Sequence, residues 1–201
     1  MAYARSCACV LVVFASSAFS SQQSTAEPPD KIRLNSEPVI SKLKSERAHG
    51  RGFKLEYLVS APLDVFWDYR TNFDNELLHQ NKYIVSHRLV SHEDNLVITE
   101  TEYTYKPKAV FKWQTTVHSD RYLLEYTLLN PKECSQKYHY GYIQLQEEGD
   151  GTRVTHVAYF DFFGASFWVN YPFKGGMTRF LEYTAQWEQQ LASELEYPGP
   201  Q

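Results

Sequence analysis

The sequence is poor in cysteine, shows no excess of basic residues and lacks the usual cofactor motifs. Only 3 of its 201 residues are cysteine, which excludes a small scaffold held together by several disulfides. Its 20 Lys and Arg residues are outnumbered by 24 Asp and Glu residues, which argues against a general nucleic-acid-binding protein. The chain contains no glycine-rich nucleotide-binding motif, no Cys-x-x-Cys and no His-Glu-x-x-His. We therefore expect no nucleic-acid partner, no cofactor and no metal site.

Long apolar runs are absent as well, and the one short run lies near the N-terminus. Residues 10–15 are apolar, follow the single charge of Arg5 and precede small residues at 16–20. A short basic region, a short apolar region and a small-residue cleavage site are typical of a secretory signal, whereas a membrane span needs ~20 apolar residues. We predict a signal peptide over residues 1–20, cleaved after Ser20 or alternatively after Ala18. The mature protein would then be periplasmic or secreted.

Removal of this leader leaves Cys134 as the single cysteine, so the mature domain is expected to fold without an internal disulfide. Residues 21–50 are polar and include a Pro-Pro pair, which predicts a flexible linker. Val39, Ile40 and Leu43 could form one short helical turn within it. The folded domain is expected over residues 51–197, followed by a tail over residues 198–201.

Aromatic residues are abundant, and their pattern predicts a β-rich domain. The chain has 15 Tyr, 12 Phe and 4 Trp, residue types that suit pleated, half-buried surfaces. Apolar and polar residues alternate from Phe53 to Ser60, which indicates a strand, and Ala61-Pro62 then favours the start of a helix. A second short helix is expected over 75–80. Further strands are predicted over 83–90, 96–105, 110–118, 122–129, 138–147 and 152–162. Their short links, including the turn 148–151, predict antiparallel pairing.

The C-terminal part changes from a period of two to a helical period. Apolar residues recur at spacings of three and four, at Met177, Phe180, Leu181, Thr184, Trp187, Leu191 and Leu195. This predicts one long amphipathic helix that buries its stripe against a face of the sheet. Glu188 lies off the stripe and is expected to be exposed.

Three segments and this helix resemble the START/Bet v1-like superfamily, which includes polyketide cyclase, dehydrase and lipid-transport relatives. The segments are the end of the first strand at 59–67, the strand at 141–145 and the hairpin at 149–155. The resemblance covers roughly residues 52–196 and lies in the order of elements. It implies an α+β helix-grip fold, in which a curved antiparallel sheet of about seven strands wraps around the long C-terminal helix and encloses an apolar cavity. The glycine-rich loop of plant Bet v1-type members is missing, since residues 91–95 stand in its place.

Alternation along the strands predicts which side chains face this cavity. The faces implied by the superfamily pattern carry His139, Gly141, Ile143 and Leu145 on one strand and Val154, His156, Ala158, Phe160 and Phe162 on the next. Two further faces are expected to carry Phe111, Trp113, Thr115 and Val117, and Thr99, Thr101 and Tyr103. From these we predict a ligand-binding set of His139, Gly141, Ile143, His156, Ala158, Phe160, Trp113 and Tyr103.

Each candidate also has a purely structural interpretation. A histidine on an apolar strand face is more often a satisfied core or rim residue than a catalyst. Glu100 and Glu102 share a strand face, but no partner is identifiable, and we expect them at the rim or in solvent. His87 and His92 flank a strand end and are expected to face water. Counted along the 148–151 turn, His139 and His156 lie too far apart along the groove to bind one metal together.

The sequence thus predicts an exported binding or carrier protein for a hydrophobic small molecule such as a lipid, sterol or polyketide-like compound. The alternative is a cyclase- or dehydratase-type enzyme, for which His139, His156 and Tyr126 are the acid–base candidates. A third hypothesis is a domain that serves only in protein contacts. Because no spacing demands catalysis, we assign no catalytic residue. We also expect a monomer that makes transient contact with a membrane.

Overall fold

The computed structural model describes residues 37–45, 50–104, 108–163 and 176–195. The predicted signal peptide over 1–20 and the tail over 198–201 lie outside the described residues. The described elements, in chain order, are β1 (Val39–Leu43), β2 (Arg51–Val59), α1 (Leu63–Thr71), the 3-10 helix η1 (Glu76–Gln80), β3 (Ile84–Glu93), β4 (Leu96–Tyr103), β5 (Val110–His118), the 3-10 helix η2 (Ser119–Arg121), β6 (Leu123–Leu128), β7 (Gln136–Glu148), β8 (Gly151–Phe162) and α3 (Gly176–Ala192).

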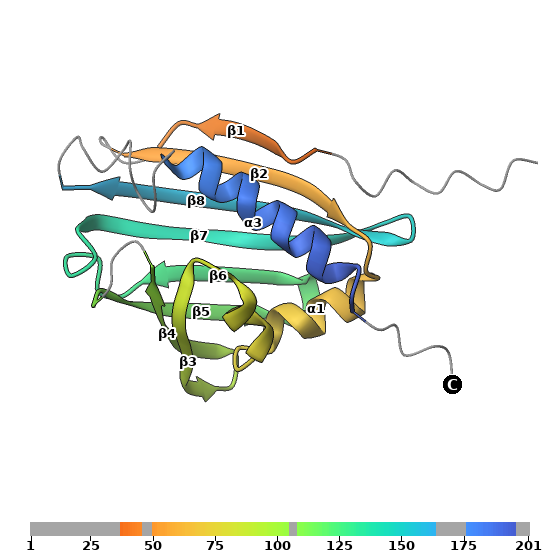
Figure 1. Cartoon of the computed structure of the whole chain (residues 1–201), viewed down its shortest axis with the longest axis horizontal. Helices are drawn as coiled ribbons and strands as arrows, with labels where there is room; N and C mark the ends of the chain where they lie inside the picture. Colours follow the sequence, from red (N-terminus) through yellow and green to blue (C-terminus); the bar gives the residue numbers. More distant parts are fainter. Residues whose placement is uncertain (1–36, 46–49, 105–107, 164–175, 196–201) are drawn as a thin grey trace, which may run out of the picture. The chain divides into compact units, whose positions relative to one another are not determined.

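All described strands belong to one antiparallel sheet. Its eight strands have the order β1-β2-β8-β7-β6-β5-β4-β3, so α1 and η1 fill the long connection between the separated strands β2 and β3. The long helix α3 lies across one face of this sheet (Figure 1). The predicted α+β helix-grip architecture is therefore confirmed, with one strand more than expected. None of the described helices is long and apolar enough to span a membrane.

The additional strand is β1, in a segment that the sequence assigns to a flexible linker or a helical turn. It pairs with β2 in a continuous register from Val39 opposite Glu56 to Leu43 opposite Gly52. Ile40 packs against the core, while Val39 remains 58% exposed, as expected of a strand at the sheet edge. The folded domain therefore begins before residue 51, and the linker prediction is wrong for residues 39–43.

The hairpin of β7 and β8 has the predicted turn and register. Glu148 pairs with Gly151, and Gly149 takes a φ of 57°, a left-handed conformation that glycine adopts without steric cost. Counting from this turn, Gly141 lies opposite Ala158, His139 opposite Phe160 and Ile143 opposite His156. Counting outward from the turn in the sequence predicts Ala158 or Tyr159 opposite Gly141, Phe160 or Asp161 opposite His139, and Ile143 or Gln144 opposite His156. Each observed pair is among these alternatives.

Helix α3 buries a face that differs from the predicted stripe at one important position. Met177, Leu181 and Leu191 are buried as expected, and Phe180, Trp187 and Leu195 pack partly against the core. Glu188, however, is only 1% exposed, so the prediction that it faces solvent is wrong. The spacing explains this, because residue 188 lies three positions after the buried Ala185 and seven after Leu181, on the same side of the helix.

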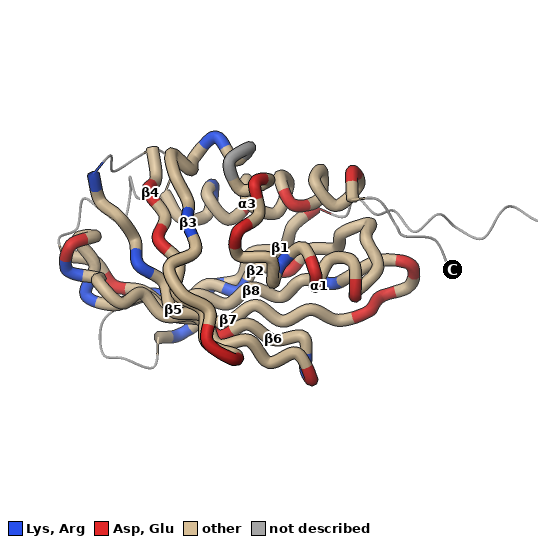
Figure 2. Tube along the Cα trace, turned by 90° about the horizontal axis from the view of Figure 1, so that it is seen from below, with Lys and Arg blue, Asp and Glu red and all other residues tan. Residues whose placement is uncertain are grey.

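Charged residues are otherwise spread over the surface with both signs interspersed. Figure 2 shows acidic and basic residues distributed along the strands and turns of the described chain. Lys54 lies 2.8 Å from Glu56, and Arg153 contacts Glu148 across the start of the β7–β8 hairpin. Exposed ion pairs of this kind contribute little stability, so the core and the interior polar contacts determine the architecture.

Candidate functional site

A cavity of about 280 Å³ lies between the sheet and the helices α1 and α3. This is close to the lower end of the ~300–1,000 Å³ typical of small-molecule pockets. Of the 21 described lining residues, twelve are aromatic or aliphatic and nine are polar. The lining residues are Tyr69, Arg70, Asn72, Phe73, Leu78, Ile84, His87, Thr99, Thr101, Tyr103, Trp113, Thr115, Leu124, Tyr126, His139, His156, Ala158, Met177, Phe180, Leu181 and Thr184.

Five of the eight residues predicted to bind a ligand line this cavity. They are Tyr103, Trp113, His139, His156 and Ala158, which come from four different strands, β4, β5, β7 and β8. The other three, Gly141, Ile143 and Phe160, are not among the lining residues. Ile143 and Phe160 are buried in the core, and the ring of Phe160 stacks on Phe53. Alternation therefore predicts the correct face of each strand but does not separate the cavity wall from the packed core.

Gly141 has a different role, because it makes room for the hydroxyl of Tyr126. A Cβ atom at residue 141 would lie 1.9 Å from the carbonyl oxygen of Val157 and 2.7 Å from the Tyr126 hydroxyl oxygen. That hydroxyl lies 2.8 Å from Nε2 of His156 and 3.1 Å from the Val157 carbonyl. A glycine at this position thus permits a Tyr126–His156 hydrogen bond on the cavity wall.

Two of the three histidines that line the cavity, His139 and His156, are held in the neutral form. Burial lowers the pKa of His139 to about 3. Burial also lowers the pKa of His156 to about 3, and the positive charge of Arg70 and the neighbouring His139 act in the same direction. The ring of His139 packs edge-to-face on Trp113 at 4.9 Å between centroids, and its Nδ1 atom has no hydrogen-bond partner among the described residues. His139 therefore offers an unused polar atom beside the cavity.

A buried polar cluster connects α1, α3 and β2, and no pattern in the sequence indicates it. Nη1 of Arg70 lies 2.5 Å from Oε1 of Glu188, while the hydroxyl of Tyr57 donates to Oε2 of the same carboxylate. Burial alone would lower the pKa of Arg70, but the carboxylate of Glu188 and the nearby tyrosines raise it on balance. Arg70 lines the cavity, and Glu188, which is not a lining residue, neutralises its charge.

Two further polar atoms of α1 lie beside the cavity without a partner in the described part of the chain. They are the hydroxyl of Tyr69 and Nε of Arg70. Burial, followed by the charge of Glu188, raises the pKa of Tyr69 well above its ordinary value, so the phenol keeps its proton. Both groups are hydrogen-bond donors, and buried donors are normally paired with protein, water or ligand.

His87 also belongs to the cavity wall, which corrects the expectation that it faces water. Its Nδ1 lies 2.8 Å from the hydroxyl of Thr101, and its Nε2 lies 3.0 Å from the carbonyl oxygen of Phe73. The pairing of β3 with β4 shifts register between Ile84 and Ser86, and such an irregularity breaks simple alternation. His92, on the same strand, is exposed as expected.

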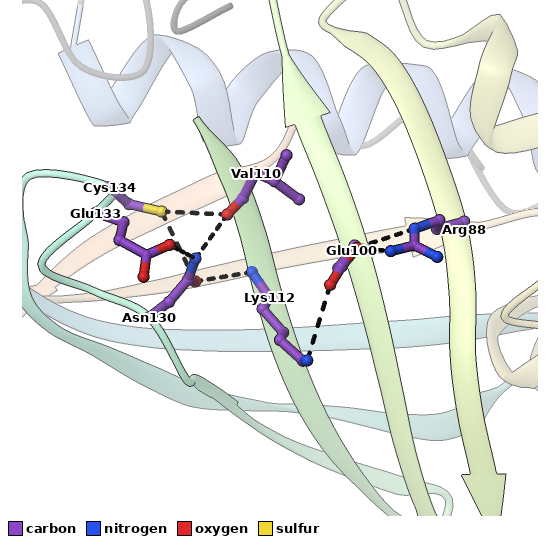
Figure 3. A network of polar contacts seen from close by, with 7 residues as sticks. All are labelled: Arg88, Glu100, Val110, Lys112, Asn130, Glu133 and Cys134. Carbon is purple, nitrogen blue, oxygen red and sulfur yellow. Dashed lines mark hydrogen bonds and ion pairs between the residues drawn. The ribbon is translucent and has the colours of Figure 1, made fainter. Parts of the chain in front are cut away.

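The paired carboxylates of β4 lie outside the cavity. Glu100 receives two hydrogen bonds from Arg88 and lies 3.8 Å from Nζ of Lys112, so it links β3, β4 and β5 by charge (Figure 3). Glu102 accepts a hydrogen bond from the backbone of Lys108. Neither carboxylate lines the cavity, in agreement with the expected rim position.

Cys134 is buried in the loop between β6 and β7, where its thiol faces the carbonyl of Val110 and the side chain of Asn130 (Figure 3). It is likewise absent from the cavity wall. Within the described ranges, no group of three or more His, Cys, Asp or Glu residues is placed to hold a metal ion.

Comparison with known proteins finds similarity in three-dimensional structure but not in sequence. No family profile and no curated protein sequence matches the chain. A STAR-related lipid transfer protein from Xanthomonas axonopodis is similar in structure, with 12% identity over 75% of this chain and 94% of that chain and a TM-score of 0.54. A START superfamily protein from Mycobacterium smegmatis has 11% identity, covers 74% and 100%, and gives a TM-score of 0.54. Norcoclaurine synthase from Thalictrum flavum has 11% identity, covers 79% and 89%, and gives a TM-score of 0.53.

These similarities agree with the strand order, the closing helix and the cavity between them. The order of elements that suggested the resemblance in the sequence is thus present in space. The chain has the START/Bet v1-like helix-grip fold.

Proposed function

We propose that this protein is an exported carrier that binds one hydrophobic small molecule in the cavity between the sheet and α3. The observation that carries the proposal is the cavity of about 280 Å³, in which twelve aromatic or aliphatic residues and nine polar residues form the described wall. Such a composition is typical of sites that bury most of a ligand and orient it by a small number of hydrogen bonds. The lipid transfer protein and the START superfamily protein of similar fold support this proposal by analogy.

The electrostatics of the wall favour binding over acid–base catalysis. A general acid or base works best when its pKa lies near the working pH. His139 and His156 have pKa values of about 3, far below that range, because both are buried. Burial also raises the pKa of Tyr126 far above its ordinary value. At neutral pH these three groups stay uncharged and serve as hydrogen-bonding anchors.

An enzyme that acts on a similar molecule is the second candidate. The hydrogen bond between the Tyr126 hydroxyl and Nε2 of His156 favours it, because this pair lies on the cavity wall and could relay a proton to a bound substrate. The similarity to norcoclaurine synthase supports the same candidate at the level of the fold.

Export, predicted from residues 1–20, is part of the proposal and is tested separately by N-terminal sequencing of the protein isolated from its own host.

The experiment that tests binding is mass spectrometry of the full chain purified from its own host under non-denaturing conditions. We expect a bound apolar compound that is released by organic solvent and returned unchanged after incubation with the protein. Conversion of that compound to a product, lost in His156→Ala, would instead establish the enzyme. The absence of any bound compound, together with no uptake of apolar compounds from a host lipid extract, would contradict both candidates.

A further inference from the structure

The charge arrangement around Arg70 bears on which ligands the cavity accepts. Arg70 is the one Lys, Arg, Asp or Glu among the described lining residues, and its side chain is only 16% exposed. In many binding sites an arginine in this position would pair with a carboxylate or phosphate of the ligand. Here a carboxylate of the protein already occupies that role.

Glu188 neutralises Arg70 but is not itself among the described residues that line the cavity. Its Oε1 atom lies 2.5 Å from Nη1 of Arg70, and its Oε2 atom accepts the hydroxyl hydrogen of Tyr57. Glu188 is 1% exposed and Tyr57 is 2% exposed, so the ion pair is held out of water. An anionic ligand head would have to share Arg70 with a buried carboxylate, and an uncompensated buried charge costs several kcal/mol.

The remaining polar atoms at the wall suit an uncharged oxygen. Nε of Arg70 and the hydroxyl of Tyr69 are donors with no acceptor in the described chain, and Nδ1 of His139 is similarly unpaired there. His139 and His156, whose pKa values are lowered to about 3 by burial, bring no positive charge to balance an anion. A carbonyl or hydroxyl oxygen on an otherwise apolar molecule would satisfy these donors without adding a charge.

We propose that the cavity selects neutral apolar molecules that carry a carbonyl or hydroxyl oxygen, and excludes carboxylates such as fatty acids. The Arg70–Glu188 pair is the specificity-determining element, since it gives a lining residue a buried, unpaired donor while keeping the site electrically neutral. This inference rests on the proposed function, because it specifies the ligand class of the same cavity.

The test uses two compounds of nearly equal shape that differ in charge, 2-naphthamide and 2-naphthoate. Their binding to the full chain is measured at neutral pH by displacement of the neutral dye Nile red. We expect the amide to bind at least about tenfold more tightly than the carboxylate. Equal binding, or tighter binding of the carboxylate, would overturn the inference while leaving the carrier proposal intact. Failure of Nile red and both compounds to bind would overturn the carrier proposal itself, and the inference with it.

Two variants test whether the ion pair is the cause. In Glu188→Gln, Arg70 loses its counter-charge, so the preference should shift toward the carboxylate by about tenfold or more. The double variant Arg70→Gln/Glu188→Gln restores neutrality and should again prefer the amide. If Glu188→Gln folds by circular dichroism and keeps the preference of the original protein, the assignment to this pair is wrong. If it does not fold, the comparison of the two compounds on the unmodified chain still decides the inference.

Discussion

Replacement of Glu188 by alanine tests the buried polar cluster and also the correction that the structure makes to the helix prediction. The change removes a carboxylate that is 1% exposed and leaves the guanidinium of Arg70 and the hydroxyl of Tyr57 without their partner. Breaking a buried ion pair by removal of one member costs ~3–5 kcal/mol. The partial exposure of Arg70, at 16%, favours the lower end of that range.

The assay is urea denaturation followed by circular dichroism. With an m value of roughly 2 kcal/mol/M, a loss of about 3 kcal/mol lowers the midpoint by roughly 1.5 M. Glu182→Ala is the matched control, since Glu182 is an exposed glutamate on the same helix and should change stability by no more than ~0.5 kcal/mol. The double variant Arg70→Met/Glu188→Met removes both charges and should recover much of the loss, because no unpaired charge remains.

The result that would refute this reasoning is an equal effect of Glu188→Ala and Glu182→Ala. It would mean that Glu188 is not buried against Arg70 in solution. A double variant as unstable as the single one would instead assign the loss to packing and not to charge.

Two further predictions follow from the wall of the cavity. Gly141→Ala places a Cβ atom 1.9 Å from the Val157 carbonyl, so it should destabilise the fold by ~1–3 kcal/mol and displace Tyr126; an unchanged urea midpoint would contradict the close approach. In the window between the folded pKa of His139, about 3, and the ordinary value of 6.5, the unfolded chain binds a proton that the folded chain does not. The free energy of unfolding should therefore fall as the pH falls through that window, and less steeply in His139→Phe; an identical pH dependence in both proteins would show that His139 is not held neutral by burial.

The parts of the fold that the sequence predicts well are those determined by local signals. The turn at Gly149 sets the register of β7 and β8, so the partners of His139 and Gly141 could be counted from the sequence. Alternation correctly assigned Ala158 and Trp113 to the inner faces of their strands. These features depend on neighbours in sequence or on a period of two, which a single chain displays directly.

The parts that the sequence did not predict depend on distant partners or on irregularities. Burial of Glu188 requires Tyr57 and Arg70, which lie 131 and 118 positions away in the chain, and a carboxylate without a known partner is normally expected in solvent. His87 lies on a strand whose register shifts, so the period of two fails beside it. The edge strand β1 has mostly exposed side chains and is stabilised by pairing with β2, a contact that composition does not reveal.

We propose that the space enclosed by the sheet and α3 is a binding site for apolar molecules. Binding of Nile red to the purified chain and to Ala158→Trp tests it most directly. Ala158 is 3% exposed and lines the cavity, so a tryptophan there should fill the space. Tyr142→Trp is the control, because Tyr142 is 37% exposed on β7 and absent from the cavity wall.

We expect saturable dye binding by the unmodified chain and by Tyr142→Trp, and at least about a tenfold loss of affinity in Ala158→Trp. All three proteins should keep the same circular dichroism spectrum. Dye binding that is equally strong in a folded Ala158→Trp protein would contradict the claim, because the bound dye would then lie outside this cavity.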